Sequence, residues 1–457
     1  MAGPRAVPPP APRVASDSAW LGHPRGLSTL FFTEMWERFS YYGMRAFLVF
    51  YMVAPINGGG LGFGVKHATS IYGTYTAGVW AAAIVGGIVA DQWLGHYRSV
   101  LVGGIIIALG HFSLALHALP FFYLGLSLIV VGTGLLKPNV SSIVGSLYAA
   151  HDARRDAGFS IFYMGINLGA AIGPLIAGYL AQKVDWHLGF ACAGVGMTLG
   201  LVQYVVGRRR LEPGILRLQA RSAADAPAAG DRPSLEGGAL GFSRAEWKRI
   251  AAMCVFFLAA VVFWAGYEQA GSTLSLFADR YTRLSAFGLS FPSSWFASVQ
   301  AIFVILLAPV FAWLWVRLGE HEPSSPTKFT AGLFFIGLSY LLLVPAATYA
   351  QGAAGVRVSP LWLVGCYCVQ ELGELSLSPV GLSVFTKLSP VKIVGMMLGV
   401  WFLADSLGNK LAGWAAGFFA SLPLPTLFGA VAGVCLAAAL IMALLIKPVR
   451  RLMGGVH

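Results

Sequence analysis

The sequence predicts an all-α membrane protein with twelve transmembrane helices in two six-helix bundles. Of its 457 residues, 57% are hydrophobic and only 11% are charged, whereas a soluble globular chain carries roughly 25% charged residues. Long apolar stretches recur along the chain, and one polar stretch divides them into two sets of six. Lipid must therefore be the solvent for most of the protein surface.

Each apolar stretch has about 20 residues or more and can cross the ~30 Å hydrocarbon core as a helix. Residues 208–249 open with three arginines and are expected to form a cytoplasmic linker between the halves 27–207 and 250–446. Residues 1–26 are proline-rich and lack the apolar core of a signal peptide, which predicts a disordered cytoplasmic arm. Residues 447–457 are expected to form a cytoplasmic tail. The spans are expected near 27–54, 68–90, 99–118, 121–147, 157–182, 188–207, 250–277, 294–317, 328–349, 358–385, 391–420 and 424–446.

Weak sequence symmetry relates the two halves. A glycine follows a tryptophan after seven residues near the start of each half, at Trp36 and at Trp264. Pro138 and Pro379 both fall in the fourth expected helix of their half. Parallel repeats of this kind place a binding site near the middle of the membrane, between the repeats.

Lysine and arginine are distributed unevenly between the two sides of the membrane. With the N terminus inside, 22 of the 31 lie in termini and loops of that side. Only five lie in loops of the opposite side: Lys66, Lys183, Arg280, Arg283 and Arg357. Cytoplasmic loops accumulate positive charge, so both termini are expected in the cytoplasm. The Ala-, Gly- and Arg-rich composition and the short outer loops favour a multi-pass protein of a bacterial inner membrane.

Ten charged residues fall inside the expected spans. A charge at the centre of a membrane helix costs about 2.5–3.5 kcal/mol on insertion scales, so these residues must pair with one another or face water. The bases are Arg38, Arg45, Lys137 and Lys410, and the acids are Glu34, Glu37, Glu268, Glu371, Glu374 and Asp405.

The first helix concentrates these charges on one face. Glu34, Arg38, Tyr41 and Arg45 recur at intervals of four, three and four residues, which forms one continuous helical stripe. Such a stripe cannot face lipid and must line a polar interior. One alternative is a set of salt bridges that only lock helices together.

The acids outnumber the bases in the spans by two. Burial in a medium of low dielectric constant favours the neutral form of an unpaired carboxylate, which then takes up a proton. Proton-coupled carriers require such a group.

The segment Glu34-Met-Trp-Glu37-Arg38-Phe-Ser-Tyr41-Tyr42-Gly43 resembles the ExxERFxYYG signature of the proton-dependent oligopeptide transporters of the major facilitator superfamily. Residues 162–169 resemble the FYxxINxG segment of the same family. Further similar segments are 86–98, 134–139, 267–269 and 373–388, so the resemblance extends over the chain beyond residue 26.

The resemblance implies a major facilitator fold and proton-driven uptake of di- and tripeptides. It implies that Arg45 and Lys137, with Tyr41, hold the peptide carboxylate. It also implies that Glu374, with Asn167 and Gln300, holds the peptide amino group. The remaining residues implied for substrate binding are Tyr42, Trp80 and Trp401. Those implied for proton coupling are Glu34, Glu37, Arg38, Lys137 and Glu268.

The chain departs from the family pattern at several positions. Gln300 stands where many members have asparagine, and Gly73 stands where animal members have histidine. Trp80 replaces a tyrosine that is common in the binding site, which indicates a more apolar pocket. The linker is too short for the two extra helices of many bacterial members. Asp405 has no assigned role, and structural and proton-related roles both stay open.

The sequence also leaves functions other than peptide transport open. A carrier of nitrate or of another peptide-like metabolite is one alternative, although nothing in nitrate needs the carboxylate of Glu374. A non-transporting peptide sensor is another. No Ser-His, Cys-His or metal triad appears in the spans, so neither an enzyme nor a catalytic residue is expected. Glu371 and Glu374 lack an accompanying histidine, so no metal is expected; nor is a cofactor or nucleic-acid partner. The protein is expected to be monomeric in its lipid bilayer.

Overall fold

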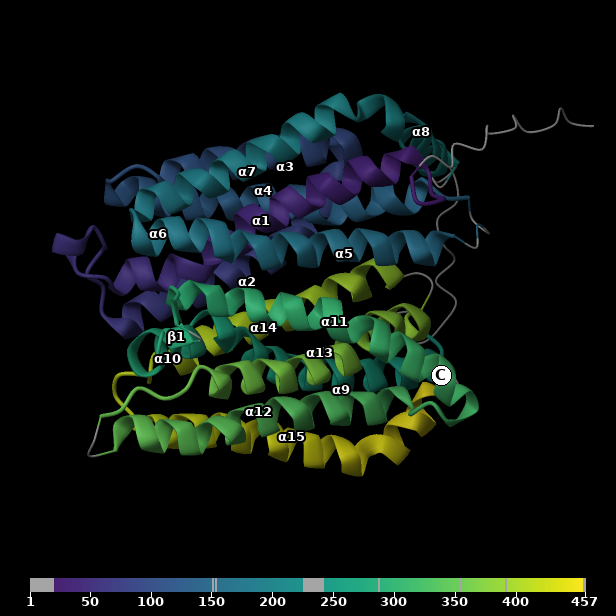
Figure 1. The fold of residues 1–457 in the computed structure, drawn as a ribbon. Helices are drawn as coiled ribbons and strands as arrows, with labels where there is room; N and C mark the ends of the chain where they lie inside the picture. Colours follow the sequence, from purple (N-terminus) through teal and green to yellow (C-terminus); the bar gives the residue numbers. More distant parts are fainter. Residues whose placement is uncertain are drawn as a thin grey trace, which may run out of the picture.

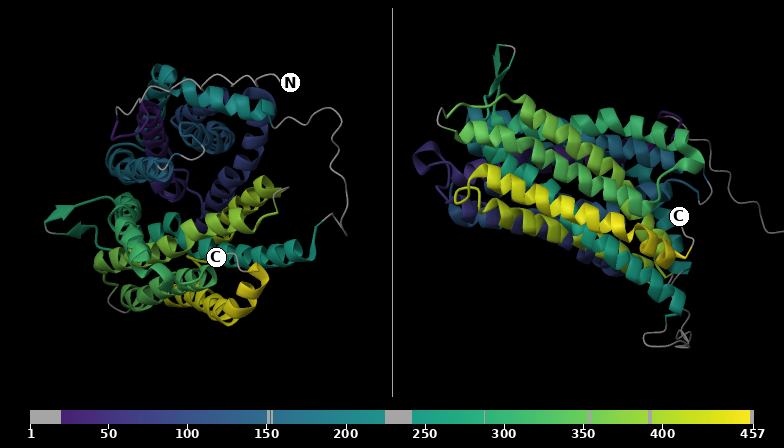
Figure 2. Two further views of the ribbon diagram at one scale, coloured as in Figure 1. Left: turned by 90° about the vertical axis from the view of Figure 1, so that its right-hand side faces the viewer. Right: turned by 90° about the horizontal axis from the view of Figure 1, so that it is seen from below.

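The computed structural model describes residues 20–149, 152, 154–224, 242–286, 288–352, 355–390 and 393–454. Within these residues the chain forms two layers of long helices that run along a common direction (Figure 1). One layer is the N-terminal half, drawn from purple to teal, and the other is the C-terminal half, drawn from green to yellow. Figure 2 shows the same division from two further directions.

The N-terminal half contains six long helical segments. Two of them pass through a π-helical stretch, so their successive parts carry separate labels. The elements are α1 (Arg25–Val53), η1 (Ile56–Gly58), α2 (Val65–Val89) with η2 (Ala90–Leu94), α3 (His96–Leu114), α4 (Leu119–Ser146), α5 (Arg155–Gly173) with η3 (Pro174–Gly178) and α6 (Tyr179–Lys183), and α7 (Trp186–Val206).

The C-terminal half repeats this plan after the helix α8 (Arg208–Ala224). Its first long segment is interrupted by a short 3₁₀ turn, and a two-stranded antiparallel hairpin follows it. The elements are α9 (Arg244–Tyr267) with η5 (Glu268–Gly271) and α10 (Thr273–Tyr281), β1 (Ser285–Ala286), β2 (Leu289–Ser290), η6 (Ser293–Trp295), α11 (Phe296–Leu318), η7 (Gly319–His321), α12 (Ser325–Gln351), α13 (Leu361–Leu388), α14 (Val394–Ala416) and α15 (Leu424–Met453).

Every expected span overlaps one of these long helical segments, although several segments extend beyond the expected bounds. In the described chain, nine segments are long and apolar enough to cross a membrane by length and composition. The other three are α1, α13 and α14, which carry most of the intramembrane charges. Only 11% of the most apolar window of α11 is buried inside the protein, so its apolar side chains face outward, as expected for contact with lipid.

Two helix starts show why the chain turns where it does. The Asp185 side chain accepts hydrogen bonds from the backbone N–H groups of His187 and Leu188 and so caps α7. Ser243 and Glu246 form a reciprocal capping box at the start of α9. The expected linker 208–249 therefore ends in a defined helix start. Its residues 225–241 lie outside the described part.

The linker also contains a helix that packs on the N-terminal half. Leu211 of α8 is fully buried, and Arg217 donates from Nη1 to the backbone oxygens of Ser146 (3.1 Å) and Leu147 (2.8 Å). These oxygens belong to the C-terminal end of α4, whose last carbonyl groups have no partner within the helix. The α8 helix therefore caps α4 from outside.

Residues 20–24 lie against the same half. The Trp20 ring lies 5.4 Å from the Phe31 ring, and His23 Nδ1 lies 2.9 Å from Tyr148 Oη. Of the expected disordered arm, 1–26, residues 1–19 lie outside the described part of the chain.

The two halves are joined along one end of the molecule, which we call the distal end because it lies opposite the start of α1. Seven polar contacts between described residues form this distal seam, from the middle of the helices outward. They are Arg45–Glu268, Gln182 Nε2–Ser293 Oγ (2.8 Å), Ser294 N–Gln182 Oε1 (2.8 Å), Trp295 Nε1–Leu175 O (3.1 Å), Ser298 Oγ–Ala171 O (2.6 Å), Ser406 Oγ–Ala77 O (2.8 Å) and Lys410 Nζ–Thr74 Oγ1 (2.6 Å).

Glycine lets α2 and α14 approach closely across the halves. A Cβ atom at Gly73 would lie 2.8 Å from the Cα of Gly413, and one at Gly413 would lie 2.6 Å from the Cα of Gly73. Any side chain at either position would push the two backbones apart. The space at Gly73 therefore excludes the histidine that animal members of the resembled family carry there.

Candidate functional site

The first half of α1 carries a buried cluster of two acids and one base. Arg38 Nε lies 3.2 Å from Glu34 Oε1 and also contacts Glu37 Oε2. All three residues are at most 2% exposed. One oxygen of each carboxylate and one guanidinium nitrogen have no hydrogen-bond partner. One cation thus serves two carboxylates, which leaves this cluster able to accept a proton.

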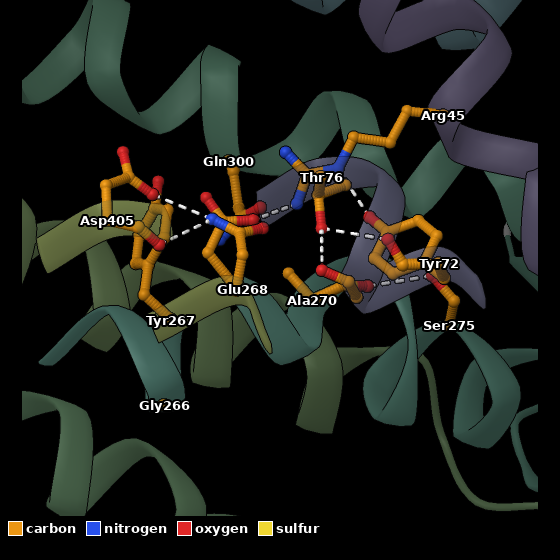
Figure 3. Close-up of polar contacts among 12 residues, drawn as sticks. Arg45, Tyr72, Thr76, Gly266, Tyr267, Glu268, Ala270, Ser275, Gln300 and Asp405 are labelled. Carbon is orange, nitrogen blue, oxygen red and sulfur yellow. Dashed lines mark hydrogen bonds and ion pairs between the residues drawn. The ribbon is translucent and has the colours of Figure 1, made fainter. Parts of the chain in front are cut away.

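Arg45, two turns further along α1, reaches across to the C-terminal half. Its Nη2 forms an ion pair with Glu268 of η5, and its Nε donates to the hydroxyl of Tyr72 in α2 (Figure 3). The guanidinium carbon also lies 5.9 Å from the ring centroids of both Tyr41 and Tyr42. Arg45 is therefore held by one charge from the opposite half and by aromatic rings from its own.

The break after α9 brings Glu268 to this position. The helix turns into the 3₁₀ segment η5 at Glu268 and leaves it at Gly271. A Cβ atom at Gly271 would overlap the Tyr72 hydroxyl and lie 3.3 Å from Arg45 Nε. Glycine at this position allows η5 to approach the N-terminal half closely.

Lys137 of α4 contacts an aromatic ring and has no acid within ion-pair distance in the described chain. Its Nζ lies 3.1 Å from the centroid of the Trp80 ring, which is a cation–π contact. Trp80 in turn stacks on Phe402 of α14 at 5.9 Å and 19°. The contact chain from Lys137 to Phe402 passes from one half to the other.

Four charged groups lie within electrostatic range of Lys137. They are Arg38, Glu37 and Glu34 of the α1 cluster and Asp405 of α14. Asp405 is 4% exposed, and its Oδ1 accepts a hydrogen bond from Asn409 Nδ2 at 2.7 Å. Lys137 is thus placed between carboxylates from both halves.

The acids of α13 form a second pole with Tyr267 of α9. Tyr267 Oη lies 2.9 Å from Glu371 Oε1 and 3.4 Å from Glu374 Oε2. Glu371 is fully buried, and Glu374 is partly exposed. Tyr163 of α5 lies within electrostatic range of both carboxylates. This acidic pole belongs to the C-terminal half, whereas Arg38, Arg45 and Lys137 belong to the N-terminal half.

Three residues expected at the site make other contacts. Gln300 Nε2 donates to Gln370 Oε1 at 3.2 Å, and Asn167 Nδ2 donates to the backbone oxygen of Tyr163 at 3.0 Å. Trp401 is 5% exposed, and its ring lies 5.4 Å from that of Phe385 in the C-terminal half. Gln300 thus contacts the residue that precedes Glu371, Asn167 contacts a tyrosine within electrostatic range of the acidic pole, and Trp401 packs into its own half.

The sequence did not reveal three of these contacts. They are the cation–π contact of Lys137 with Trp80, the position of Asp405 near Lys137, and the shared hydroxyl between Glu371 and Glu374. The spacing of Glu371 and Glu374, three residues apart on one helix, was the available signal for the last of them. The other two depend on how α4 is rotated against α2 of its own half and against α14 of the other half.

Comparisons with known proteins identify relatives of the whole chain. The sequence pattern of the POT family matches residues 97–213 and 243–430. The uncharacterized transporter YclF of Bacillus subtilis is 42% identical over 96% of this chain and 96% of its own. The di-/tripeptide transporter of Lactococcus lactis subsp. cremoris is 37% identical over 97% of this chain and 99% of its own. A solved structure of a mutant POT peptide transporter in complex with alafosfalin has a TM-score of 0.86 and 39% identity, and covers 96% of this chain and 99% of that one.

Proposed function

Since this chain belongs to the POT family of transporters, we propose that it is a proton-coupled symporter that takes up di- and tripeptides by alternating access. The observation that carries this proposal is the separation of charge between the halves. Arg45 and Lys137 belong to the N-terminal half, whereas Glu374 belongs to the C-terminal half. A zwitterionic peptide needs a cation for its carboxylate and an anion for its amino group.

We assign the peptide carboxylate to Arg45 and Lys137, with Tyr41 and Tyr42 beside them. The amino group is assigned to Glu374, which has no lysine or arginine as an ion-pair partner in the described chain. Asn167 and Gln300 border the amino end, and Trp80 and Trp401 shape pockets for the peptide side chains. A peptide bound at both ends draws the halves together, so occupancy favours closure.

Proton coupling is assigned to the groups that share cations with the peptide. When the peptide carboxylate binds Arg45, Glu268 loses its ion-pair partner. An unpaired carboxylate inside the membrane is costly, and protonation removes that cost. Glu34, Glu37 and Arg38 provide a second acceptor next to Lys137, so Lys137 can exchange partners as the proton moves.

The distal seam supports a carrier that is closed on its outer side. We place both termini in the cytoplasm and the protein in a bacterial inner membrane. The reason is that the termini and loops at the end opposite the distal seam carry most of the Lys and Arg residues. Under this assignment the closed distal end faces away from the cytoplasm.

Counterflow in proteoliposomes tests the proposal. Vesicles loaded with unlabelled dialanine should accumulate external labelled dialanine, and protein-free vesicles should not. Labelled dialanine that binds without accumulating would instead indicate a sensor, and labelled nitrate that exchanges in its place would indicate an anion carrier.

A further inference from the structure

Two carboxyl groups meet on α13 without a lysine or arginine partner among the described residues. Glu371 and Glu374 lie three residues apart on one face of the helix. Their carboxyl groups share one donor, since the Tyr267 hydroxyl lies 2.9 Å from Glu371 Oε1 and 3.4 Å from Glu374 Oε2. Within the described chain, neither forms an ion pair with lysine or arginine. An ionised carboxylate can only accept hydrogen bonds, and the hydroxyl has a single proton to donate, so a direct hydrogen bond between the two carboxyl groups needs a proton on one of them.

The geometry indicates which group holds this proton. Tyr267 Oη donates to Glu371 Oε1 at 2.9 Å. The other oxygen of Glu371, Oε2, is buried and has no hydrogen-bond partner. A proton on Oε2 lets it donate to Glu374, while Oε1 continues to accept from Tyr267. Every polar atom of Glu371 then has a partner.

The difference in exposure agrees with this assignment. Glu371 is fully buried, whereas Glu374 is partly exposed and can keep its charge in contact with water or a ligand. Tyr267 is itself fixed, because its ring stacks on Phe263 at 5.8 Å and meets the edge of Trp264 at 5.4 Å. The donor that defines the orientation of Glu371 is therefore rigid.

Among the described residues, the titratable groups with the strongest electrostatic effect on this pair are acidic or neutral. They are Tyr42 of α1, Tyr163 of α5, Glu268 of η5 and Cys368 on α13 itself. None of them is a cation. The carboxylate of this pair has no compensating positive charge, and an ammonium group would supply one.

We infer that Glu371 is a neutral carboxylic acid in the substrate-free carrier and that it positions the Glu374 carboxylate for the ammonium group of the substrate. This inference rests on the proposed function for the identity of the ligand. With the proton retained on Glu371, one carboxylate faces one ammonium, and the buried site is neutral when occupied. Glu371 acts through Glu374 and need not touch the substrate.

Infrared spectroscopy tests the protonation state without any transport. The purified, substrate-free protein should show a carboxylic-acid C=O stretching band that is absent from Glu371→Gln. The Glu212→Gln variant, in which an exposed carboxylate of α8 is changed, should retain the band. A spectrum of Glu371→Gln with the same acid band as the wild type would overturn the inference.

A transport measurement tests the positioning role. The amide N–H of glutamine can replace the donated hydrogen bond, so Glu371→Gln should keep the KM for dialanine within a few-fold of the wild type. A methionine side chain has a similar length but no hydrogen-bond donor. The KM of Glu371→Met for dialanine should therefore rise about tenfold or more, as expected when a hydrogen bond to a charged group is lost.

The amine dependence separates positioning from a general structural effect. In the wild type, free dialanine should compete far better than N-acetyl-dialanine, and this preference should shrink in Glu371→Met by the same factor as the KM rises. An unchanged preference, or equal loss of function in Glu371→Gln and Glu371→Met, would overturn the positioning role. If the wild type carries no dialanine but shows the acid band, the proposed function fails and the protonated Glu371 stands.

At alkaline pH the wild type should lose affinity as Glu371 ionises, because two carboxylates then repel each other. The amino group of the substrate also loses its proton at about pH 8, so Glu371→Gln should keep that shared part of the decline and lack the part that Glu371 adds. A decline that is identical in both proteins would contradict the assignment of the proton to Glu371.

Discussion

At the scale of single residues, the charged side chains inside the bundles differ in how well they are compensated. Arg38 and Arg45 each have a carboxylate partner, Lys137 lies over a tryptophan ring, and Glu374 has no lysine or arginine partner in the described chain. Buried charges without partners are expensive. Binding of substrate or of a proton should therefore stabilise most strongly the buried charges that have no charged partner.

Glu374→Gln should abolish high-affinity uptake of dialanine. Removing one partner of a buried charge pair costs about 2–5 kcal/mol, which corresponds to a loss of affinity of roughly 30-fold to several thousand-fold. Competition against labelled dialanine in proteoliposomes measures this loss, with Glu212→Gln as the control. Equal transport of N-acetylated and free dipeptides by the wild type would show that Glu374 does not hold the amino group.

Lys137→Ala should eliminate proton-driven accumulation of peptide. The variant removes the cation that lies between the α1 cluster and Asp405, so those carboxylates lose the group that links their protonation to the substrate. Uptake under an imposed pH gradient measures the effect, and Lys66→Ala, which changes an exposed lysine at the start of α2, is the control. Normal concentrative uptake by Lys137→Ala would exclude a role of this lysine in coupling.

The sequence was sufficient to select the charged residues but not their partners. Insertion cost alone singles out Glu34, Arg45 and Glu374, because each lies inside an apolar stretch. It does not show that Arg45 pairs with Glu268, since that pair depends on the break at η5. Likewise, Trp80 was expected to make the pocket more apolar, and its contact with Lys137 depends on the rotation of α2 against α4.

At the scale of helices, the most extensive contact between the halves in the described chain is the one between α2 and α14. The backbones meet at Gly73 and Gly413, and the Trp80–Phe402 stack lies further along the same pair of helices. Movement of the halves must therefore involve sliding or opening along this contact.

Gly73→Val should destabilise the protein and slow counterflow. The new side chain would overlap the backbone of α14, and overpacking typically costs about 1–3 kcal/mol. Thermal unfolding in detergent, followed by counterflow, measures both effects. Gly433→Val is a matched control, because nothing lies within 4 Å of a Cβ atom at that position of α15. Equal effects of the two substitutions would mean that helix propensity, and not the contact, is responsible.

The long helices were predictable because each requires a continuous apolar stretch. The first expected span, 27–54, coincides closely with α1 (Arg25–Val53), and the all-α fold is confirmed. The helix α8 was not anticipated, because its apolar residues are too few for a membrane span. Leu211, Ile215 and Leu218 recur at intervals of four and three residues, and this pattern of an amphipathic helix was the available signal.

At the scale of the whole molecule, the balance of charge predicts how transport responds to voltage. A neutral zwitterion accompanied by one proton carries one positive charge inward. That charge is worth about 2.3 kcal/mol per 100 mV of membrane potential. A carrier that uses this energy must respond to voltage even when the pH is equal on both sides.

A potassium-diffusion potential, negative inside, should increase uptake in proteoliposomes at equal pH. The response to voltage and the response to a pH gradient should vanish together in Glu37→Gln, because this variant removes one carboxylate of the α1 cluster. Peptide exchange by that variant serves as the control for folding. Uptake that is independent of voltage would indicate electroneutral or uncoupled transport.

The distal seam also has an evolutionary consequence. Three of its contacts end on main-chain carbonyl groups of the N-terminal half, and every amino acid supplies such a group. Mutations at these acceptor positions can accumulate without loss of the hydrogen bond, whereas the donor side chains of the C-terminal half cannot drift in the same way. The two sides of one interface should therefore diverge at different rates among descendants of this protein, slowly at the donors Trp295, Ser298 and Ser406 and faster at the acceptors Ala77, Ala171 and Leu175.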